Sequence, residues 1–271
     1  MLGEYDIVSN GKITNEYEAY SMIIDAPLVA KIAAPGQFVH VKCGGLTLRR
    51  PISITSARHG QIRICYEVRG EGTNWLAGLK SGDKIDFIGP RGKGFDVSDK
   101  SKTVLLVGGG IGIYPLYFVA QAYADYSIAR GGYGEENLFI TLGFRDSEHM
   151  TLEKEFIEFR RKLYISTEDG SYGRKGTVID MVQEVLDNNK IDIVMTCGSK
   201  AMMKEVAFEA TKRNIRCQVS LEERMACGIG SCLACACKIK DAENEEFTNK
   251  RVCVDGPVFD IIEGNEVDWE C

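Results

Sequence analysis

The fold is decided by the stretch TVLLVGGGIGIYPL at residues 103–116, a buried-strand run that ends in a glycine loop. A short apolar run bounded by glycines is typical of a strand inside a parallel sheet. The loop backbone can approach a pyrophosphate at the N-terminus of the following helix. Pro115 stands where the last glycine of G-x-G-x-x-G would be, so we interpret the loop as that of a different nucleotide-binding family. The candidate nucleotide-binding residues are Gly108, Gly109, Gly110 and Gly112.

Strands and helices alternate after this loop. The patterns predict strands at 137–142, 162–166, 192–196 and 216–219, and helices from the loop to about 126 and at 152–161, 178–186 and 200–213. This alternation predicts an α/β unit with a doubly wound parallel sheet, which binds ligands at the carboxyl ends of its strands. Cys197 and Gly198 follow one such strand. Cys197 fits a place beside a nicotinamide and, equally, a small residue at a crowded strand end.

The first hundred residues follow a different pattern. Short runs rich in Val, Ile, Tyr and Phe at 18–24, 37–42, 61–67 and 84–88 are separated by Gly and Pro turns. Closely spaced strands of this kind predict an antiparallel barrel or sandwich.

Two motifs within this β region carry possible cofactor chemistry. Arg50-Pro51-Ile52-Ser53 can present a guanidinium and a hydroxyl to a diphosphate and a flavin edge. Gly72 and Thr73 open a predicted helix at 73–79, where free amides can receive a phosphate. Each motif also has an interpretation without a ligand. The Arg-Pro motif could be a surface strand edge, and the Gly-Thr motif could be a helix cap. Their order within one β domain favours the cofactor reading.

Four cysteines near the C-terminal end have the spacing of an iron-sulfur site. Cys227, Cys232 and Cys235 form C-x4-C-x2-C, and Cys253 follows eighteen residues later. Three close thiolates and one distant one are the plant-type [2Fe-2S] pattern. Zinc sites favour paired C-x2-C spacings, often with His, and a disulfide framework suits small secreted chains. Both remain alternatives, and Cys237, two residues after Cys235, is a competing ligand.

Composition narrows the function classes. The chain has 271 residues, a net charge of −6, ten cysteines and three histidines. The acidic balance argues against nucleic-acid binding, and no apolar run is long enough to span a membrane. We expect a cytoplasmic protein, because many cysteines without a secretory signal indicate a reducing compartment. The isolated histidines disfavour a Ser-His-Asp or zinc-hydrolase site.

The order of these parts resembles the ferredoxin-NADP reductase superfamily. Within it, ERMACGIGSC at 223–232 and CVDGPVF at 253–259 are similar to the electron-transfer subunits of dihydroorotate dehydrogenase B. The resemblance covers essentially the whole chain. It implies three domains: an FAD-binding β-barrel at 1–98, an NAD-binding α/β domain at 99–220 and a small [2Fe-2S] loop domain at 221–271.

The resemblance also implies the cofactors and their residues. FAD would be held by Arg50, Pro51, Ile52 and Ser53, lined by Tyr66, Glu67 and Val68, and bound at its phosphates by Gly72 and Thr73. Cys227, Cys232, Cys235 and Cys253 would ligate the [2Fe-2S] cluster, and the glycine loop with Cys197 and Gly198 would meet NAD. Two departures from the family pattern are Tyr114, where a small residue is usual, and a longer connection at 127–136.

The implied function is electron transfer. A catalytic partner subunit with FMN would oxidise dihydroorotate, and electrons would pass through the cluster and FAD to NAD+, in a heterotetramer of two of each subunit. One alternative is the small flavin and iron-sulfur subunit of an NADH-dependent ferredoxin:NADP oxidoreductase or sulfide dehydrogenase, where the first ligand is typically an Asp instead of Cys227. Another is a zinc-bearing interaction module without enzymatic activity.

Overall fold

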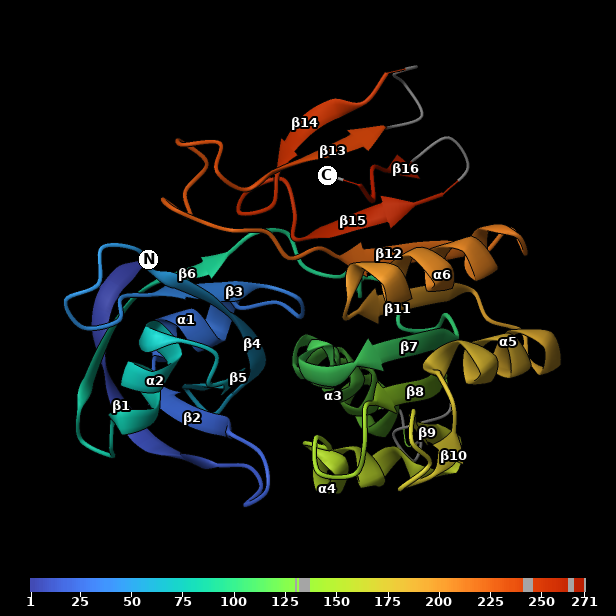
Figure 1. Ribbon diagram of the computed structural model, residues 1–271, viewed down its shortest axis with the longest axis horizontal. Coiled ribbons are helices and arrows are strands. Elements are labelled where there is room, and N and C mark those ends of the chain that lie inside the picture. The colour runs from blue at the N-terminus through green and yellow to red at the C-terminus, as the bar shows by residue number, and fades with distance from the viewer. Residues whose placement is uncertain (130, 132–136, 241–245, 263–265, 271) are drawn as a thin grey trace.

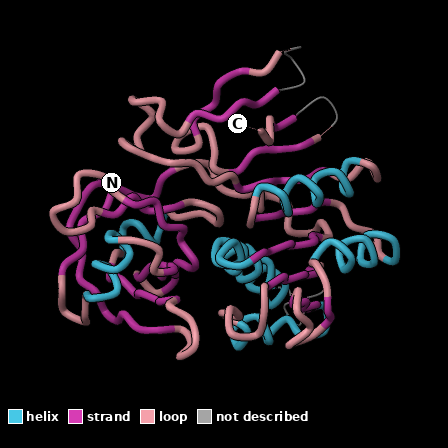
Figure 2. The backbone as a smooth tube through the Cα atoms, in the orientation of Figure 1, coloured by secondary structure: helices cyan, strands magenta, loops and turns pink. Residues whose placement is uncertain are grey.

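The computed structural model describes residues 1–129, 131, 137–240, 246–262 and 266–270. Figure 1 shows a barrel on one side, a sheet with helices on the other, and C-terminal strands along one edge of both. Figure 2 shows that strands dominate the barrel and the C-terminal part, whereas most helices surround the sheet. Most of the predicted longer connection, at 130 and 132–136, lies outside the described residues.

The N-terminal strands close into an antiparallel barrel, as the sequence predicted. The order is β1-β2-β5-β4-β3-β6. The elements are β1 (Leu2–Lys12), β2 (Ala19–Asp25), α1 (Pro27–Ile32), β3 (Phe38–Val41), β4 (Arg50–Arg58), β5 (Gln61–Glu67), α2 (Glu71–Gly78) and β6 (Lys84–Arg91). Alternate residues such as Val39, Val41, Ile54 and Ile64 fill the interior, because successive side chains point to opposite faces of a strand.

The second unit is the predicted parallel sheet, in the order β10-β9-β8-β7-β11-β12-β15. Its elements are β7 (Val104–Gly109), η1 (Gly110–Gly112), α3 (Ile113–Ala129), β8 (Leu138–Phe144), α4 (Glu153–Phe156), η2 (Ile157–Lys162), β9 (Leu163–Thr167), β10 (Arg174–Lys175), α5 (Val178–Asn188), β11 (Ile193–Cys197), α6 (Lys200–Thr211) and β12 (Arg216–Ser220).

Strand β7 lies inside this sheet and is buried on both faces. Val104 and Leu106 belong to the core cluster that contains residues of α3 and α4, whereas Leu105 and Val107 belong to the cluster with α5 and α6. This two-sided burial is why residues 104–107 are continuously apolar.

The C-terminal part is divided between two sheets. Strands β13 (Ala236–Lys240), β14 (Thr248–Arg251) and β16 (Glu266–Val267) form a small antiparallel sheet. Strand β15 (Val258–Ile261) instead pairs antiparallel with β12, so it completes the edge of the parallel sheet (Figure 1). No helix among the described residues is long and apolar enough to cross a membrane.

Candidate functional site

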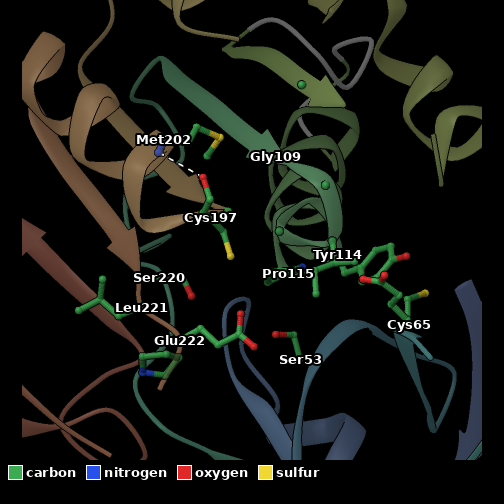
Figure 3. A pocket seen from close by; sticks show the side chains of 18 of the residues that line it. Ser53, Cys65, Gly109, Tyr114, Pro115, Cys197, Met202, Ser220, Leu221 and Glu222 are labelled. Atoms are coloured by element: carbon green, nitrogen blue, oxygen red, sulfur yellow. Dashed lines mark hydrogen bonds between the residues drawn. The ribbon is translucent and has the colours of Figure 1, made fainter. Parts of the chain in front are cut away.

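A cleft of ≈ 780 Å³ lies where the barrel, the parallel sheet and the cysteine segment meet. Most of the predicted cofactor residues border it: Arg50, Pro51, Ile52, Ser53, Tyr66, Glu67, Thr73, Gly109, Gly110, Gly112, Cys197 and Gly198. Three do not, namely Val68, Gly72 and Gly108. Figure 3 shows Ser53 of the barrel on one side of this space and Cys197 and Gly109 of the sheet on the other. The cleft therefore joins the two predicted cofactor regions.

The barrel wall of the cleft contains a cationic corner. A Cβ at Gly72 would come within 2.9 Å of Arg50 Nε, so only a glycine leaves this room for the guanidinium beside the start of helix α2. Thr73 Oγ1 accepts hydrogen bonds from the backbone N–H groups of Arg69 at 2.9 Å and Gly70 at 3.3 Å, which shapes the preceding loop. A guanidinium next to a helix N-terminus suits a diphosphate. These residues fit the FAD that the sequence implied.

Tyr66 and Glu67, at the end of β5, line the barrel side of the same cleft. The Tyr66 ring is buried, which raises the pKa of its phenol, and its hydroxyl donates to Asn10 Oδ1 at 3.0 Å. The Glu67 carboxylate accepts from Arg69 Nε at 2.5 Å. Val68 does not line the cleft, and its backbone N–H donates to Glu18 O at 2.9 Å. The buried Tyr66 ring gives an apolar edge for a ring cofactor, and the Glu67 carboxylate gives a polar group beside it.

The glycine loop is packed tightly against the loop after β11. A Cβ at Gly112 would lie 2.2 Å from the Cys197 carbonyl oxygen, and one at Gly109 would lie 2.5 Å from Met202 Sδ. A Cβ at Gly110 would meet nothing within 4 Å. Gly112 and Gly109 therefore let two strand ends touch, while Gly110 leaves open space for a ligand. This arrangement fits a dinucleotide at the carboxyl ends of the strands.

Cys197 lies at the centre of this wall. Burial raises the pKa of its thiol to about 12, and the Ser220 hydroxyl partly opposes that shift. Because the thiol stays protonated, Cys197 offers a small polarisable group for contact with a ligand and does not act as a nucleophile. Figure 3 shows the Cys197 sulfur pointing into the cleft near Ser220.

Tyr114 borders the cleft without filling it. Its ring is buried and lies beside Cys65, on the side of the cleft away from Cys197 (Figure 3). Its hydroxyl makes no hydrogen bond within the described structure, and burial raises its pKa. The residue that departs from the family pattern thus leaves the Cys197 side of the cleft open.

The last residue of β12 and the link from β12 to the cysteines contribute lining residues that sequence reasoning missed. These are Ser220, Leu221, Glu222, Glu223 and Met225. Figure 3 shows the Glu222 carboxylate and the Ser53 hydroxyl facing each other across the cleft. Their position directly after a predicted parallel strand was the available signal, because ligands gather at such strand ends.

The four cysteines approach one another in two pairs. The Cys227 N–H donates to Cys232 Sγ at 3.5 Å, and the Ile229 N–H donates to Cys227 Sγ at 3.5 Å. The Ile229 amide is the main cause that lowers the pKa of Cys227 to about 6. In the other pair, burial raises the pKa of Cys253 to about 12, and the Cys235 thiol beside it adds to this shift. Loop amides directed at sulfur stabilise thiolates.

This donor set fits a two-iron cluster. Two irons bridged by sulfides each take two thiolates, which two pairs can supply. Cys232 is exposed, whereas Cys235 and Cys253 are buried. Cys237 is buried in β13, and burial, Glu223 and Cys235 raise the pKa of its thiol to about 12.

Comparison with known proteins agrees with this geometry. Residues 222–264 match the iron-sulfur cluster binding domain of dihydroorotate dehydrogenase B, and residues 106–207 match the oxidoreductase NAD-binding domain. The chain is 42% identical over 254 residues to the dihydroorotate dehydrogenase B (NAD(+)) electron transfer subunit of Caldanaerobacter subterraneus, covering 93% of this chain and 94% of that protein. The subunit of the same name from Desulforamulus reducens is 39% identical, covering 89% and 90%.

Solved structures extend the comparison. An NADH-dependent reduced ferredoxin-NADP oxidoreductase chain superposes with a TM-score of 0.81 and 33% identity, over 98% of this chain and 90% of that one. A ferredoxin NADP+ reductase from Neisseria gonorrhoeae with bound FAD and NADP has a TM-score of 0.62 at 15% identity, over 77% and 89%. The second likeness concerns the fold alone.

Proposed function

Because the chain belongs to the family of dihydroorotate dehydrogenase B (NAD(+)) electron transfer subunits, we propose that it passes electrons from the FMN of a catalytic dihydroorotate dehydrogenase subunit to NAD+. This activity belongs to pyrimidine biosynthesis. The observation that carries the proposal is the continuity of the two sites. Met225 lines the cleft, and Cys227, the first cysteine of the loop, follows it by two residues.

The cofactors are FAD, a [2Fe-2S] cluster and NAD. When bound, the cluster supplies one-electron transfer, and the flavin converts single electrons into the hydride that nicotinamide accepts. The chain's own residues position these groups. The Arg50 guanidinium and the N-terminus of α2 bind the FAD diphosphate, and Ser53, Tyr66 and Glu67 orient its ring. Gly110 and the backbone at Gly198 receive NAD beside Cys197.

The cluster ligands in this proposal are Cys227, Cys232, Cys235 and Cys253. The amides of the 227–232 turn point at sulfur and stabilise the thiolate form. Cys237 is a structural residue of β13, because the thiol beside Cys253 is that of Cys235 and not that of Cys237. Gly228 and Gly230 have φ values of +65° and +88°, so the turn needs glycine at these positions.

The partner is a catalytic subunit, as the name of the family, an electron transfer subunit, implies. We propose that it carries FMN and assembles with this chain as two copies of each subunit. Its docking surface is the tip of the cysteine loop, where Ile229 is 50% exposed and Leu233 is 63% exposed beside exposed Cys232. An apolar tip around a ligand gives a short path between the cluster and an external flavin.

We propose the domain division 1–98, 99–220 and 221–271, with β15 as the part of the last domain that completes the neighbouring sheet. We also propose a cytoplasmic location, because the four proposed ligand cysteines need a reducing compartment that keeps their thiols from pairing as disulfides.

The test is purification of the chain together with the catalytic subunit it binds. We expect flavin and iron-sulfur absorption bands, a mass equal to two of each subunit, and NAD+ reduction that depends on dihydroorotate. A colourless protein, or a complex that oxidises no dihydroorotate, would contradict the proposal.

The likeness to the NADH-dependent ferredoxin-NADP oxidoreductase chain favours a second candidate, in which the partner is a ferredoxin-linked flavoprotein. Cys227 argues against it, because an Asp is typical as the first ligand of that small subunit. NADH-dependent ferredoxin and NADP reduction by the complex, without dihydroorotate oxidation, would select this candidate.

A further inference from the structure

His40 is a buried histidine between the flavin-binding strand and the cluster loop. It lies in β3, and antiparallel pairing places it directly opposite Pro51 of β4. Its side chain has no exposed surface, and neither ring nitrogen has a hydrogen-bond partner in the described structure. A buried polar ring without partners costs stability, so such a group calls for an explanation.

The ring faces the cluster loop. In β3, Val39 and Val41 point into the barrel core, whereas Phe38 and His40 lie on the opposite face. Phe38 belongs to the core cluster that includes Cys235 and Cys253. A Cβ at Gly228 would lie 2.2 Å from His40 Nδ1, so the loop backbone rests directly on the ring.

Other contacts fix the loop in the same place. Arg91 Nε, from β6, donates to Gly228 O at 3.0 Å, and Arg251 donates to Gly230 O at 3.1 Å. A neutral imidazole carries one N–H donor and one acceptor nitrogen.

We propose that His40 is a positioning residue for the iron-sulfur cluster, which holds the Cys227–Gly228 backbone against the flavin-binding strand and sets the reduction potential of the cluster. This inference rests on the proposed function. Hydrogen bonds and dipoles near the sulfurs are among the main determinants of a cluster's potential. An N–H dipole beneath the loop stabilises the extra negative charge of the reduced cluster.

The test uses the complete complex with FAD and cluster bound. We expect His40→Phe, which keeps an aromatic ring but removes both nitrogens, to retain FAD and to make the cluster about tenfold harder to reduce. For a one-electron couple this is a shift of about 59 mV to lower potential. His40→Gln, which keeps a donor and an acceptor, should return the potential toward that of the unsubstituted protein. The readout is a redox titration followed by electron paramagnetic resonance.

His149→Phe is the matched control, because His149 is bonded to Asp146 in the α/β unit and packs on Tyr17. It should leave the potential unchanged. A normal cluster with an unshifted potential in His40→Phe would overturn the inference but leave the proposed function intact. If the unsubstituted protein gave no cluster signal, both the inference about His40 and the proposed function would be contradicted.

A second measurement covers the case in which His40→Phe binds no cluster. Pulsed electron paramagnetic resonance of the unsubstituted reduced protein, labelled with ¹⁵N only in its three histidines, should detect a histidine nitrogen coupled to the cluster. His149→Phe should keep this coupling and His40→Gln should abolish it. No coupling from labelled histidine would contradict the placement of His40 beside the cluster.

Discussion

The guanidinium of Arg63 in strand β5 lies 2.8 Å from the carboxylate of Glu155 in helix α4, joining the barrel to the α/β unit. Their side chains are only 19% and 27% exposed, and Arg63 Nε also donates to Ser21 Oγ at 2.7 Å. A second pair across the same junction, Arg58 and Asp125 at 2.7 Å, is 43% and 61% exposed. The barrel and the α/β unit are thus joined by ion pairs of unequal burial.

Glu155→Ala should destabilise the protein by about 2 kcal/mol, because it leaves a half-buried guanidinium without its charged acceptor. Asp125→Ala, the matched control, should cost less than about 0.5 kcal/mol, since exposed ion pairs are screened by water. Urea denaturation of the FAD-bound protein measures both. Equal losses from the two substitutions would show that burial of the pair has no influence.

Gly72→Ala should weaken FAD binding with little loss of protein stability. The added Cβ would lie 2.9 Å from Arg50 Nε, and the flexible arginine can relieve the clash only by moving away from the diphosphate site. We expect at least about tenfold weaker binding, comparable to the loss of one charge-assisted hydrogen bond. Flavin retained after dialysis gives the measurement.

Gly78→Ala, in the same helix, is the control. A Cβ there would meet nothing within 4 Å, so the change should leave FAD bound and stabilise the helix slightly. Arg50→Ala should reproduce the effect of Gly72→Ala. Full flavin occupancy in both Gly72→Ala and Arg50→Ala would rule out this corner as the diphosphate site.

Cys232→Ser should abolish the iron-sulfur cluster while FAD and NADH oxidation by artificial acceptors remain largely intact. Cys232 is exposed at the loop tip and pairs with Cys227, so its loss removes a ligand without disturbing the cleft. Electron paramagnetic resonance of the reduced protein checks this. Cys237→Ala serves as the control and should keep the signal, whereas an unchanged spectrum in Cys232→Ser would refute the ligand assignment.

Acid should weaken the ion pairs that Arg216 of β12 makes with Asp96 and Asp260. Hydrogen bonds from Ser98 and Arg216 lower the pKa of Asp96 from its usual 3.8 to about 2, and Arg216 also pairs with Asp260 of β15. Because the folded-state pKa is depressed, this stabilisation is present above about pH 4 and is lost as the pH falls towards 2. Urea denaturation at pH 7, 4 and 3 should show a shallower acid loss for Asp96→Asn. The same pH profile in both proteins would exclude a contribution from Asp96.

The sequence predicted the barrel and the parallel sheet because their buried strands carry clear apolar runs. Strand β1 was not among the predicted strands. Ile7 is its one buried residue, so the sequence of β1 lacks a sustained alternation of apolar and polar residues. The predicted helix at 152–161 is instead α4 followed by the 3-10 segment η2, with left-handed Leu152 before it and non-helical Phe159 within it. Local patterns do not reveal such breaks, because packing decides them.

The candidate site was predictable where chemistry follows spacing. Thus, the C-x4-C-x2-C and Arg-Pro-Ile-Ser motifs could be predicted from the sequence. Most of the residues predicted to bind the flavin and the nucleotide border one cleft. Glu222 and His40 carry no motif. Glu222 reaches the cleft only because β12 ends beside it, and His40 meets Gly228 only through the register of β3 and the return of the loop. Long-range register of this kind cannot be inferred from one sequence.

With Cys253 as the proposed fourth cluster ligand, the pairing of β15 with β12 ties maturation of the metal centre to completion of the sheet. Cys253 lies five residues before β15, so the fourth thiolate reaches its place when 258–261 pairs with the sheet edge. In a chain truncated before β15, strand β12 would lose its hydrogen-bonding partner. The exposed edge of β12 would then be prone to aggregation. Iron loading and a protected sheet edge thus depend on the same few C-terminal residues.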